Sequence, residues 1–380
     1  MDEKFFVFSK EKTMKNIILI TGGCGFIGTN AADYYLKRGY KVIIFDNLSR
    51  VGAEINLNWL KTRGPFIFIK GDIRNDKKIL EIFKKYKPGL VLHLASQVTM
   101  VNSIKNPRED FEVNALGTFN LLEAMRKTKS KASAIFSSTN KVLGDLSYIP
   151  TIEKEKRYEY NKYIKGVDED FPLNFYGPYG CSKGAADQYF LDYARIFGLN
   201  TIVFRQSTIY GPRQFGIEEQ GWIAWFCNCL IFGKPVTIYG SGKQVRDLLY
   251  IDDLISAYDL AAINIKKTRG QAYNIGGGPK FSLSLLELIE ILEKISGKKF
   301  YPVKSFTGSK RKSKILFNVV NYKFGSWRSG DQKIYISDIS RAKKDFNFQP
   351  KISPKEGVLK LYNWISENKT LIKKSGVFHI

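Results

Sequence analysis

The chain has 380 residues, of which 44% are hydrophobic, so it can bury one large core or two smaller ones. Its formal net charge of +24 is scattered along the sequence, which favours an anionic substrate over a nucleic-acid partner. Two histidines, and four cysteines without zinc or disulfide spacing, argue against a metal site and a Ser-His-Asp triad. No uninterrupted apolar run approaches the length of a membrane span, which needs about 20 residues. Residues 1–13 show no signal-peptide pattern, so we expect an N-terminal extension to a cytoplasmic protein.

Residues 16–20 form a short apolar run that predicts a strand buried on both faces. The turn TGGCGFIGTN, an amphipathic stretch and the strand KVIIFD, which ends in Asp46, follow it. Gly22 permits a tight turn, Gly25 lets the backbone approach a pyrophosphate, and Gly28 allows close packing of helix against strand. Asp46 would accept hydrogen bonds from ribose hydroxyls and repel a 2′-phosphate. The pattern therefore predicts a dinucleotide cofactor, NAD rather than NADP.

Further apolar runs alternate with helix-like segments and lie at 65–72, 90–96, 133–139 and 200–205. This alternation predicts an α/β fold of the Rossmann type, with a doubly wound parallel sheet. Because ligands of such sheets bind where the strands end, the polar residues at these ends are candidate site residues. Asp72 closes one strand and would reach the adenine. Ser137, Ser138 and Thr139 close another and would face the nicotinamide and the substrate.

Tyr179 and Lys183 stand four residues apart in YGCSK. In a helix this spacing places both side chains on one face. A cation beside a phenol lowers the pKa of the phenol, so we expect Lys183 to favour the phenolate of Tyr179. A phenolate can take a proton from a sugar hydroxyl while a hydride leaves the same carbon. With the dinucleotide turn, the pair indicates redox chemistry on an alcohol.

The chain resembles the extended short-chain dehydrogenase/reductase family, which includes NAD-dependent nucleotide-sugar epimerases and dehydratases. The motifs that carry this resemblance are TGGCGFIG, FDNLSR, GDIRN, SSTNKVLGD, YGCSK, QVRDLLYIDD, NIGGG and WRSGDQ. The resemblance implies that a smaller mixed α/β domain binds the substrate in a cleft beside the Rossmann domain. We expect the NAD-binding domain at 14–210, with returns near 249–263 and 270–276. Residues 211–380 would be mainly the substrate-binding domain.

The resemblance also implies roles for individual residues. The expected catalytic residues are Thr139, Tyr179 and Lys183, with Tyr179 as the base. The expected cofactor-binding residues are Gly22, Gly25, Phe26, Ile27, Gly28, Asp46, Asn47, Ser49, Arg50, Asp72, Ile73, Leu94, Ala95, Gln97, Asn114, Ser137, Tyr179 and Lys183. The expected substrate-binding residues are Thr139, Thr208, Arg246 and Arg328. The two arginines would bind the diphosphate, although each could also be a solvated surface charge.

Some positions depart from the family pattern. Leu143 stands where relatives have a tyrosine, and Thr208 replaces an asparagine that touches the pyrophosphate in relatives. The segment 304–325 is longer than in related epimerases and would either cover the nucleotide site or form a solvated loop. Trp222 and Trp225 lie at helical spacing, so we expect them in the core rather than at a ligand.

These features predict an NAD-dependent nucleotide-sugar epimerase that works through a transient ketosugar. Several stretches resemble the branch of the family that acts at C2, so a CDP-linked sugar is the favoured substrate. A UDP-sugar 4-epimerase, a dehydratase, a decarboxylase and a non-catalytic nucleotide-binding module are the alternatives. Asn140 and Lys141 follow Thr139 where dehydratases carry paired acids, which argues against dehydration. Related enzymes pair through the helix of the catalytic tyrosine, so we expect a homodimer or homotetramer.

Overall fold

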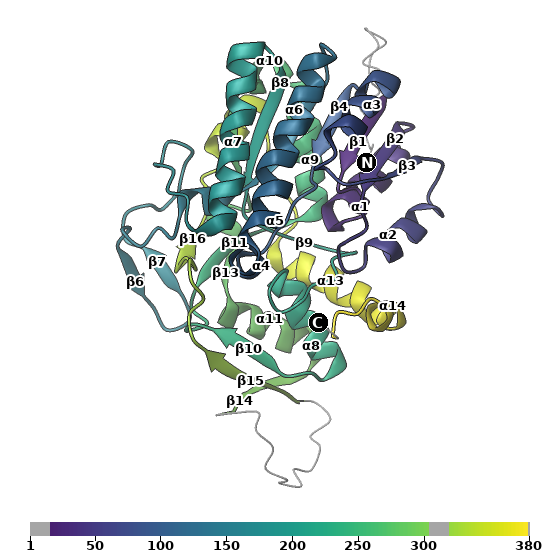
Figure 1. Cartoon of the computed structure of the whole chain (residues 1–380). Helices are drawn as coiled ribbons and strands as arrows, with labels where there is room; N and C mark the ends of the chain where they lie inside the picture. The colour runs from purple at the N-terminus through teal and green to yellow at the C-terminus, as the bar shows by residue number, and fades with distance from the viewer. Residues whose placement is uncertain (1–15, 304–318, 379–380) are drawn as a thin grey trace, which may run out of the picture.

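The computed structural model describes residues 16–303 and 319–378 (Figure 1), so the expected extension 1–13 lies outside the described residues. A seven-stranded sheet forms the centre, and every neighbouring pair in it is parallel. In sheet order its strands are β12 (Ala272–Ile275), β8 (Asn200–Gln206), β5 (Ser133–Thr139), β4 (Leu90–His93), β1 (Ile17–Thr21), β2 (Lys41–Asp46) and β3 (Ile67–Lys70). The predicted Rossmann-type sheet is confirmed. Its strand order reverses between β1 and β4, which is where such sheets open a ligand crevice.

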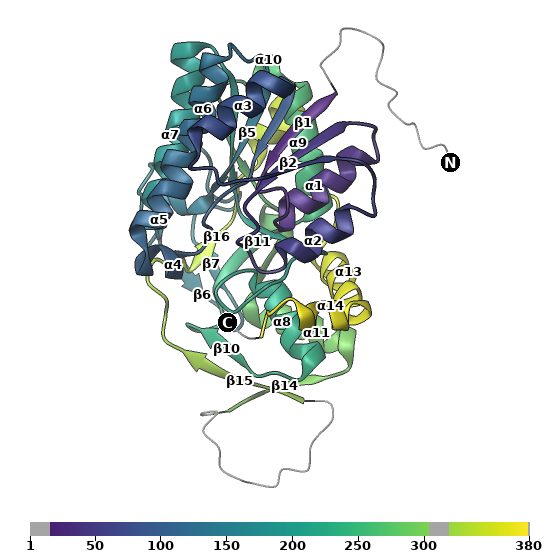
Figure 2. The same ribbon diagram turned by 45° about the vertical axis from the view of Figure 1, so that its right-hand side comes forward.

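Helices cover both faces of this sheet (Figure 2). One face carries α1 (Phe26–Leu36), α2 (Ala53–Leu60) and α9 (Ile251–Ile263), and the other carries α3 (Asp76–Tyr86), α6 (Gly117–Lys127) and α7 (Gly177–Phe197). Successive side chains of a strand point to opposite faces, so the buried residues of β1 divide between two cores. Ile18 and Ile20 pack under α1 and α2, whereas Leu19 packs under α3, α6 and α7.

Short elements connect the strands on the α7 side of the sheet. They are α4 (Met100–Lys105), α5 (Pro107–Phe111), the π-helix η1 (Glu112–Leu116), the 3₁₀-helix η2 (Asn140–Leu143) and the hairpin of β6 (Thr151–Glu153) and β7 (Tyr158–Tyr160). In the part of the chain that the structure describes, no helix is long and apolar enough to cross a membrane.

A second group of strands and helices lies beyond the carboxyl ends of the large sheet (Figure 1). One small sheet contains β9 (Thr208–Tyr210), β11 (Val245–Tyr250), β13 (Ser282–Ser284) and β16 (Ile334–Tyr335), and another contains β10 (Val236–Tyr239), β15 (Val319–Gly325) and β14 (Lys299–Pro302). The helical elements of this group are α8 (Trp222–Phe232), η3 (Pro279–Phe281), α11 (Leu285–Ser296), α13 (Pro354–Glu367) and α14 (Lys369–Lys374). Helices α10 (Ile265–Thr268) and α12 (Ser340–Phe346) lie with the large sheet instead, where α10 contacts α9 and α12 contacts β12.

The expected insertion at 304–325 needs a correction. Its last part is strand β15, which lies in the middle of a three-stranded parallel sheet and pairs with both β10 and β14. For residues 319–325, both a cover over the nucleotide site and a solvated loop are therefore wrong. Alternating β-branched and aromatic residues in VVNYKFG explain the strand. Residues 304–318 lie outside the described residues.

A buried ion pair fastens α7 to the large sheet. The Arg205 guanidinium on β8 donates to both carboxylate oxygens of Asp187 on α7, each at 3.0 Å, and the side chains are 4% and 0% exposed. The hydroxyl of Ser138 donates to the same carboxylate at 2.8 Å. Asp187 lies four residues after Lys183 on the same helix, so this contact also holds the helix face that carries Tyr179.

We expect Asp187→Asn to lower the free energy of unfolding by about 3–5 kcal/mol, because it leaves Arg205 charged and buried without its partner. Glu81→Gln, which opens the surface pair of Glu81 with Lys78, is the control and should cost less than about 1 kcal/mol. Chemical denaturation of the two variants measures both quantities. Equal losses would mean that the buried pair does not hold α7.

Candidate active site

A cavity of about 970 Å³ opens at the carboxyl ends of the large sheet and extends to α8, β10 and β11. This volume lies near the upper end of the about 300–1,000 Å³ usual for ligand pockets. Among the residues predicted for the site, all except Asn114 line this cavity. The fold therefore brings together residues from both halves of the chain, from Gly22 to Arg328.

The glycine turn between β1 and α1 forms the floor of the dinucleotide end. Gly22 has a φ of 69°, which a side chain would strain, and its N–H donates to the carbonyl of Phe45 at 2.8 Å. A Cβ on Gly28 would lie 2.4 Å from the Gly22 oxygen and 2.6 Å from the Cα of Gly23. Helix α1 begins without a side-chain cap at Gly25, so its first N–H groups are available to an anion. These features fit the pyrophosphate of a dinucleotide.

Asp46 ends β2 at the edge of this turn and is 8% exposed. Its carboxylate accepts from the backbone N–H of Cys24 at 2.9 Å and of Leu48 at 2.7 Å. Burial raises the pKa of Asp46, and these two hydrogen bonds act against that rise. A carboxylate offers more acceptor positions than these two bonds use, so Asp46 can shape the turn and still accept from ribose hydroxyls.

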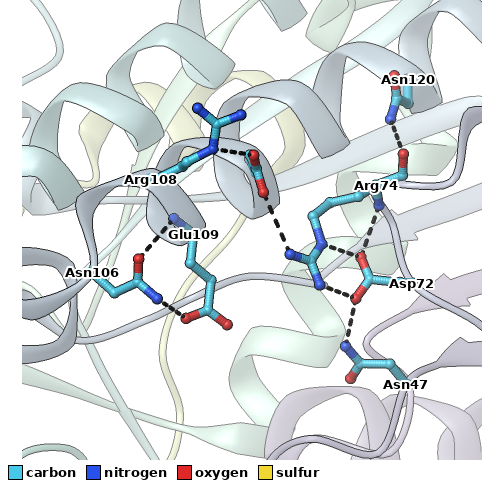
Figure 3. Close-up of polar contacts among 8 residues, drawn as sticks. Asn47, Asp72, Arg74, Asn106, Arg108, Glu109 and Asn120 are labelled. Carbon is cyan, nitrogen blue, oxygen red and sulfur yellow. Dashed lines mark hydrogen bonds and ion pairs between the residues drawn. The ribbon is translucent and has the colours of Figure 1, made fainter.

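Asp72 is already bound by neighbouring side chains, as Figure 3 shows. The Arg74 guanidinium donates to its two oxygens at 2.8 and 2.9 Å, and the amide of Asn47 donates at 3.0 Å. Hydrogen bonding from Arg74 lowers the pKa of Asp72 to about 2. Arg74 also lies 3.5 Å from Glu112 on η1 and lines the cavity. Sequence reasoning missed Arg74, although it follows Asp72 in the motif GDIRN.

Lys183 projects from α7 behind the end of β5. Its ammonium donates to the carbonyl of Ser137 at 2.5 Å and to the hydroxyl of Ser96 at 3.3 Å. It also lies 4.2 Å from the centre of the Phe136 ring. Burial lowers the pKa of Lys183 to about 7, while the carboxylates of Asp110 and Asp187 act in the opposite direction. The charge on this lysine therefore depends on its surroundings near neutral pH.

Tyr179 lies one helical turn before Lys183 and is 8% exposed. Burial raises the pKa of its phenol to about 12. Hydrogen bonding with Thr139 and the charge of Arg50 lower it, whereas Asp110 raises it further. None of these effects comes from Lys183, so the expectation that Lys183 acidifies this phenol stays a prediction. The two groups share a helix face, but the ammonium is directed to Ser137 and Ser96.

Asn114, predicted to contact the cofactor, lies behind the cavity wall and is 1% exposed. Its amide oxygen accepts from the Ser96 hydroxyl at 2.7 Å and from the backbone N–H of Gln97 at 3.0 Å. Its amide nitrogen donates to Ser182 on α7 at 3.1 Å. Asn114 therefore holds the loop after β4 and supports the surroundings of Lys183, while its direct contact with the cofactor stays a prediction.

The far end of the cavity carries cations from three segments. The Arg246 guanidinium donates to the carbonyl of Val245 at 2.8 Å. The guanidinium of Arg328 lies 3.7 Å from the centre of the Tyr239 ring. The Lys141 ammonium, which sequence reasoning did not assign, donates to the carbonyl of Gly330 at 2.8 Å, and burial lowers its pKa to about 8. Such a group of cations suits a diphosphate.

Other cavity residues were missing from the predicted set. Several carry a buried polar atom with no partner among the described residues: Asn56 Oδ1, Arg213 Nε, Gln214 Oε1, Trp225 Nε1 and Gln244 Oε1. Buried polar groups normally find a partner, so these five atoms are exceptions among the residues around the cavity. Trp222 and Trp225 pack against the core as expected, but both also line the cavity. Their spacing alone gave no indication of the second role.

The two departures from the family pattern have different surroundings. Thr208 lines the cavity at the start of β9. Leu143 is fully buried in a small apolar cluster with Val142 and Leu146, so this position offers no ring to the cavity. Within residues 16–303 and 319–378, no group of three or more His, Cys, Asp or Glu side chains could hold a metal ion.

A bridge crosses the cavity between its two ends. The Arg50 guanidinium, which follows β2, donates to the side-chain oxygen of Gln220, which precedes α8. Arg50 also lies close enough to Tyr179 for its charge to lower the pKa of the phenol. One arginine thus contacts the substrate side of the cavity and influences the group predicted to be the base.

The glycine turn, the acid at the end of β2 and the Tyr179–Lys183 helix face define an NAD-binding oxidoreductase-type site on a Rossmann fold. The model of the NAD dependent epimerase/dehydratase family matches residues 18–276, and this chain belongs to that family. The resemblance inferred from the sequence is confirmed, and so is NAD as the cofactor. The glycine turn and Asp46 would hold its pyrophosphate and ribose.

Comparison with known proteins gives closer relatives within this family. The chain is 48% identical to CDP-paratose 2-epimerase of Salmonella typhi over 92% of this chain and 99% of that protein. It is 32% identical to UDP-glucuronate 4-epimerase of Thermodesulfobacterium geofontis over 93% and 98% of the two chains. The crystal structure of UDP-glucuronic acid 4-epimerase from Bacillus cereus with UDP-glucuronic acid and NAD superimposes with a TM-score of 0.74 and 29% identity, covering 92% and 99% of the chains.

We expect Gly28→Ala to weaken NAD binding by about tenfold or more, or about 1.4 kcal/mol, because the new Cβ displaces backbone atoms of the turn. Gly180→Ala is the matched control, since its Cβ would meet no atom closer than 3.4 Å. Isothermal titration with NAD measures both variants. Unchanged affinity in Gly28→Ala would show that the turn does not bind the dinucleotide.

Proposed function

We propose that the protein is an NAD-dependent nucleotide-sugar epimerase that inverts C2 of a CDP-linked sugar, converting CDP-paratose to CDP-tyvelose. The observation that carries this proposal is the 48% identity to CDP-paratose 2-epimerase over 92% of the chain. The cavity supports it, because a phenol, a hydroxyl and two arginines line one space. Membership of the family does not by itself imply a preference for CDP or a cytoplasmic location, so both belong to this proposal. The absence of a nucleic-acid partner also stays a prediction.

Tyr179, as the phenolate, takes the proton of the C2 hydroxyl while C2 becomes a ketone. NAD, held by the glycine turn and Asp46, would supply the acceptor for the C2 hydride and the donor for its return to the opposite face, so the cycle would have no net oxidation. Thr139, whose hydroxyl bonds with Tyr179, orients the same C2 oxygen. When the hydride returns, Tyr179 gives its proton back to that oxygen. Lys183 would bind the ribose of the nicotinamide end.

Inversion requires that the ketosugar turn over while its nucleotide stays bound. Arg246 and Arg328 suit this requirement, because they line the same cavity as Thr139 and can hold the diphosphate. Arg328 is itself held by the Tyr239 ring at 3.7 Å and by the carbonyl of Glu218 at 3.2 Å. The sugar then rotates about a fixed diphosphate.

The surroundings of Thr139 argue against dehydration. A dehydratase expels water from the carbon next to the oxidised one and uses acidic side chains beside its Ser or Thr. Here Asn140 donates to the side chain of Gln332 at 3.1 Å, and Lys141 donates to the carbonyl of Gly330. Neither residue supplies a carboxylate for the second proton transfer.

Incubation of the full chain and NAD with CDP-paratose and, separately, with UDP-glucose tests the substrate, with NMR of the products. We expect inversion at C2 of the CDP-sugar and a loss of about 10²–10⁴-fold in rate for Tyr179→Phe. Glu81→Gln on the surface of α3 is the control. Faster turnover of UDP-glucose would favour a 4-epimerase. Loss of water or of carbon dioxide from the sugar would favour a dehydratase or a decarboxylase. If Tyr179→Phe were as active as the wild type, Tyr179 would not be the catalytic base.

We further propose that two copies pair through the outer face of α5, η1 and α7. Large apolar side chains are exposed there: Phe111 (57%), Leu116 (39%), Tyr189 (45%), Ile196 (61%) and Phe197 (46%). Exposed apolar residues gathered in this way are typical of a contact surface. A second copy presenting the same helices is the occupant that the family resemblance supports.

Ile196→Glu should shift the protein from dimer to monomer in light scattering, because the new carboxylate would be buried without a partner. Ile164→Glu is the control, since Ile164 is 85% exposed in the loop after β7. If both variants keep the mass of the wild type, this face is not the interface.

A further inference from the structure

Asp110 is a buried carboxylate for which the proposed mechanism has no use. It lies on α5 and is 0% exposed. Its oxygens accept from the Ser182 hydroxyl at 2.5 Å, from the Gln97 amide at 2.9 Å and from the Asn114 amide at 3.2 Å. All three donors are neutral. A buried carboxylate with only neutral donors is costly, which suggests that its charge has a use nearby.

The hydrogen bonds of Asp110 lead to the amine of Lys183. By accepting from the Asn114 amide nitrogen, Asp110 leaves the Asn114 oxygen directed to the hydroxyl of Ser96 at 2.7 Å. The Lys183 ammonium then donates to the oxygen of Ser96 at 3.3 Å. Asp110 also binds Ser182, the residue next to Lys183 on α7. The carboxylate therefore fixes both the helix that carries the amine and the hydroxyl that receives it.

Asp110 also acts on the two catalytic groups through its charge. Burial lowers the pKa of Lys183, and among the nearby charges Asp110 acts most strongly to raise it. Asp110 also raises the pKa of Tyr179. Asp187, the other carboxylate near Lys183, is already bound to Arg205 by two hydrogen bonds. Asp110 is thus the carboxylate whose charge no bonded cation offsets.

The other titratable groups around this network do not replace it. His93 on β4 faces Lys183, but burial lowers the pKa of His93 to about 3, so the ring stays neutral. Arg50 reaches Tyr179 from the loop after β2. The charged neighbours of Asp110 in sequence lie at the surface, where Arg108 bonds to Glu112 at 2.9 Å and Glu109 bonds to Asn106 (Figure 3). Helix α4 contributes the neutral Thr99 at its start.

We propose that Asp110 is a positioning residue that seats the Lys183 ammonium and sets the pH window in which Tyr179 and Lys183 work together. This inference rests on the proposed function, in which the phenolate of Tyr179 is the base. Asp110 does not line the cavity, so it acts through Lys183 and Tyr179 rather than on the substrate.

Asp110→Asn tests the inference, because it keeps the size of the side chain and removes its charge. In the full chain with NAD and CDP-paratose, we expect the bell-shaped profile of kcat/KM against pH to move. Asp110 raises the pKa of both groups, so its loss should shift both limbs to lower pH by roughly one unit or more. The KM for the nucleotide sugar at the pH optimum should not change. Asp110→Glu, which keeps the charge, should leave the limbs where the wild type has them.

A fall in kcat with both limbs unmoved would overturn the inference, since it would show a merely structural role. Glu81→Gln, which removes a distant surface charge, is the control for the profile. If Asp110→Asn does not fold, Asp110→Ser removes the same charge and leaves room for water beside Ser182.

A second readout does not depend on the sugar. The near-ultraviolet absorbance of the Tyr179 phenolate, taken as wild type minus Tyr179→Phe with NAD present, should titrate at lower pH in Asp110→Asn. No turnover of any nucleotide sugar would refute the proposed function, while this titration would still test Asp110. An unshifted titration would refute the role of Asp110.

Discussion

Burial of ionisable groups is the constraint on which this site depends. Tyr179 and Lys183 lie on one face of α7 and project into a space where water cannot easily stabilise a phenolate or an ammonium. Burial moves the pKa of the phenol up to about 12 and that of the amine down to about 7, so it opposes the charged form of both groups. The surrounding residues have to offset these shifts. Thr139 and Arg50 do so for the phenol, and Asp110 and Asp187 do so for the amine.

The large sheet supplies the rigid frame for this arrangement. Its parallel strands end at one edge, so the turn after β1, the acid of β2, the loop after β4 and the end of β5 all face the same cavity. Helix α7 is fastened to β8 and β5 through Asp187, Arg205 and Ser138. The second group of strands adds cations from β11 and from the segment before β16. Neither half of the chain holds the complete site.

Local pattern was enough to predict the fold and most of the cavity. The glycine turn, the strand-end residues and the YGCSK helix have short-range signatures, because each depends on backbone geometry within one turn or one strand end. The hydrogen-bond partners of the site residues could not be predicted from such local patterns. Lys183 meets Ser137 and Ser96 rather than the phenol, Asn114 lies behind the wall, and Asp72 is bound by Arg74. The sequence did not predict strand β15, because its partners β10 and β14 are separated from it by long stretches of chain. Gln214 and Gln244 line one cavity only through the tertiary fold.

The contact between Arg50 and Gln220 links the acidity of the Tyr179 phenol to the binding of the nucleotide sugar. Arg50 comes from the dinucleotide half and lowers the pKa of the phenol, while Gln220 comes from the loop before α8 and holds the same guanidinium. A nucleotide sugar that moves this loop would reposition Arg50 and so alter the proton affinity of Tyr179. Arrival of the sugar and readiness of the base would then be thermodynamically coupled through a single guanidinium.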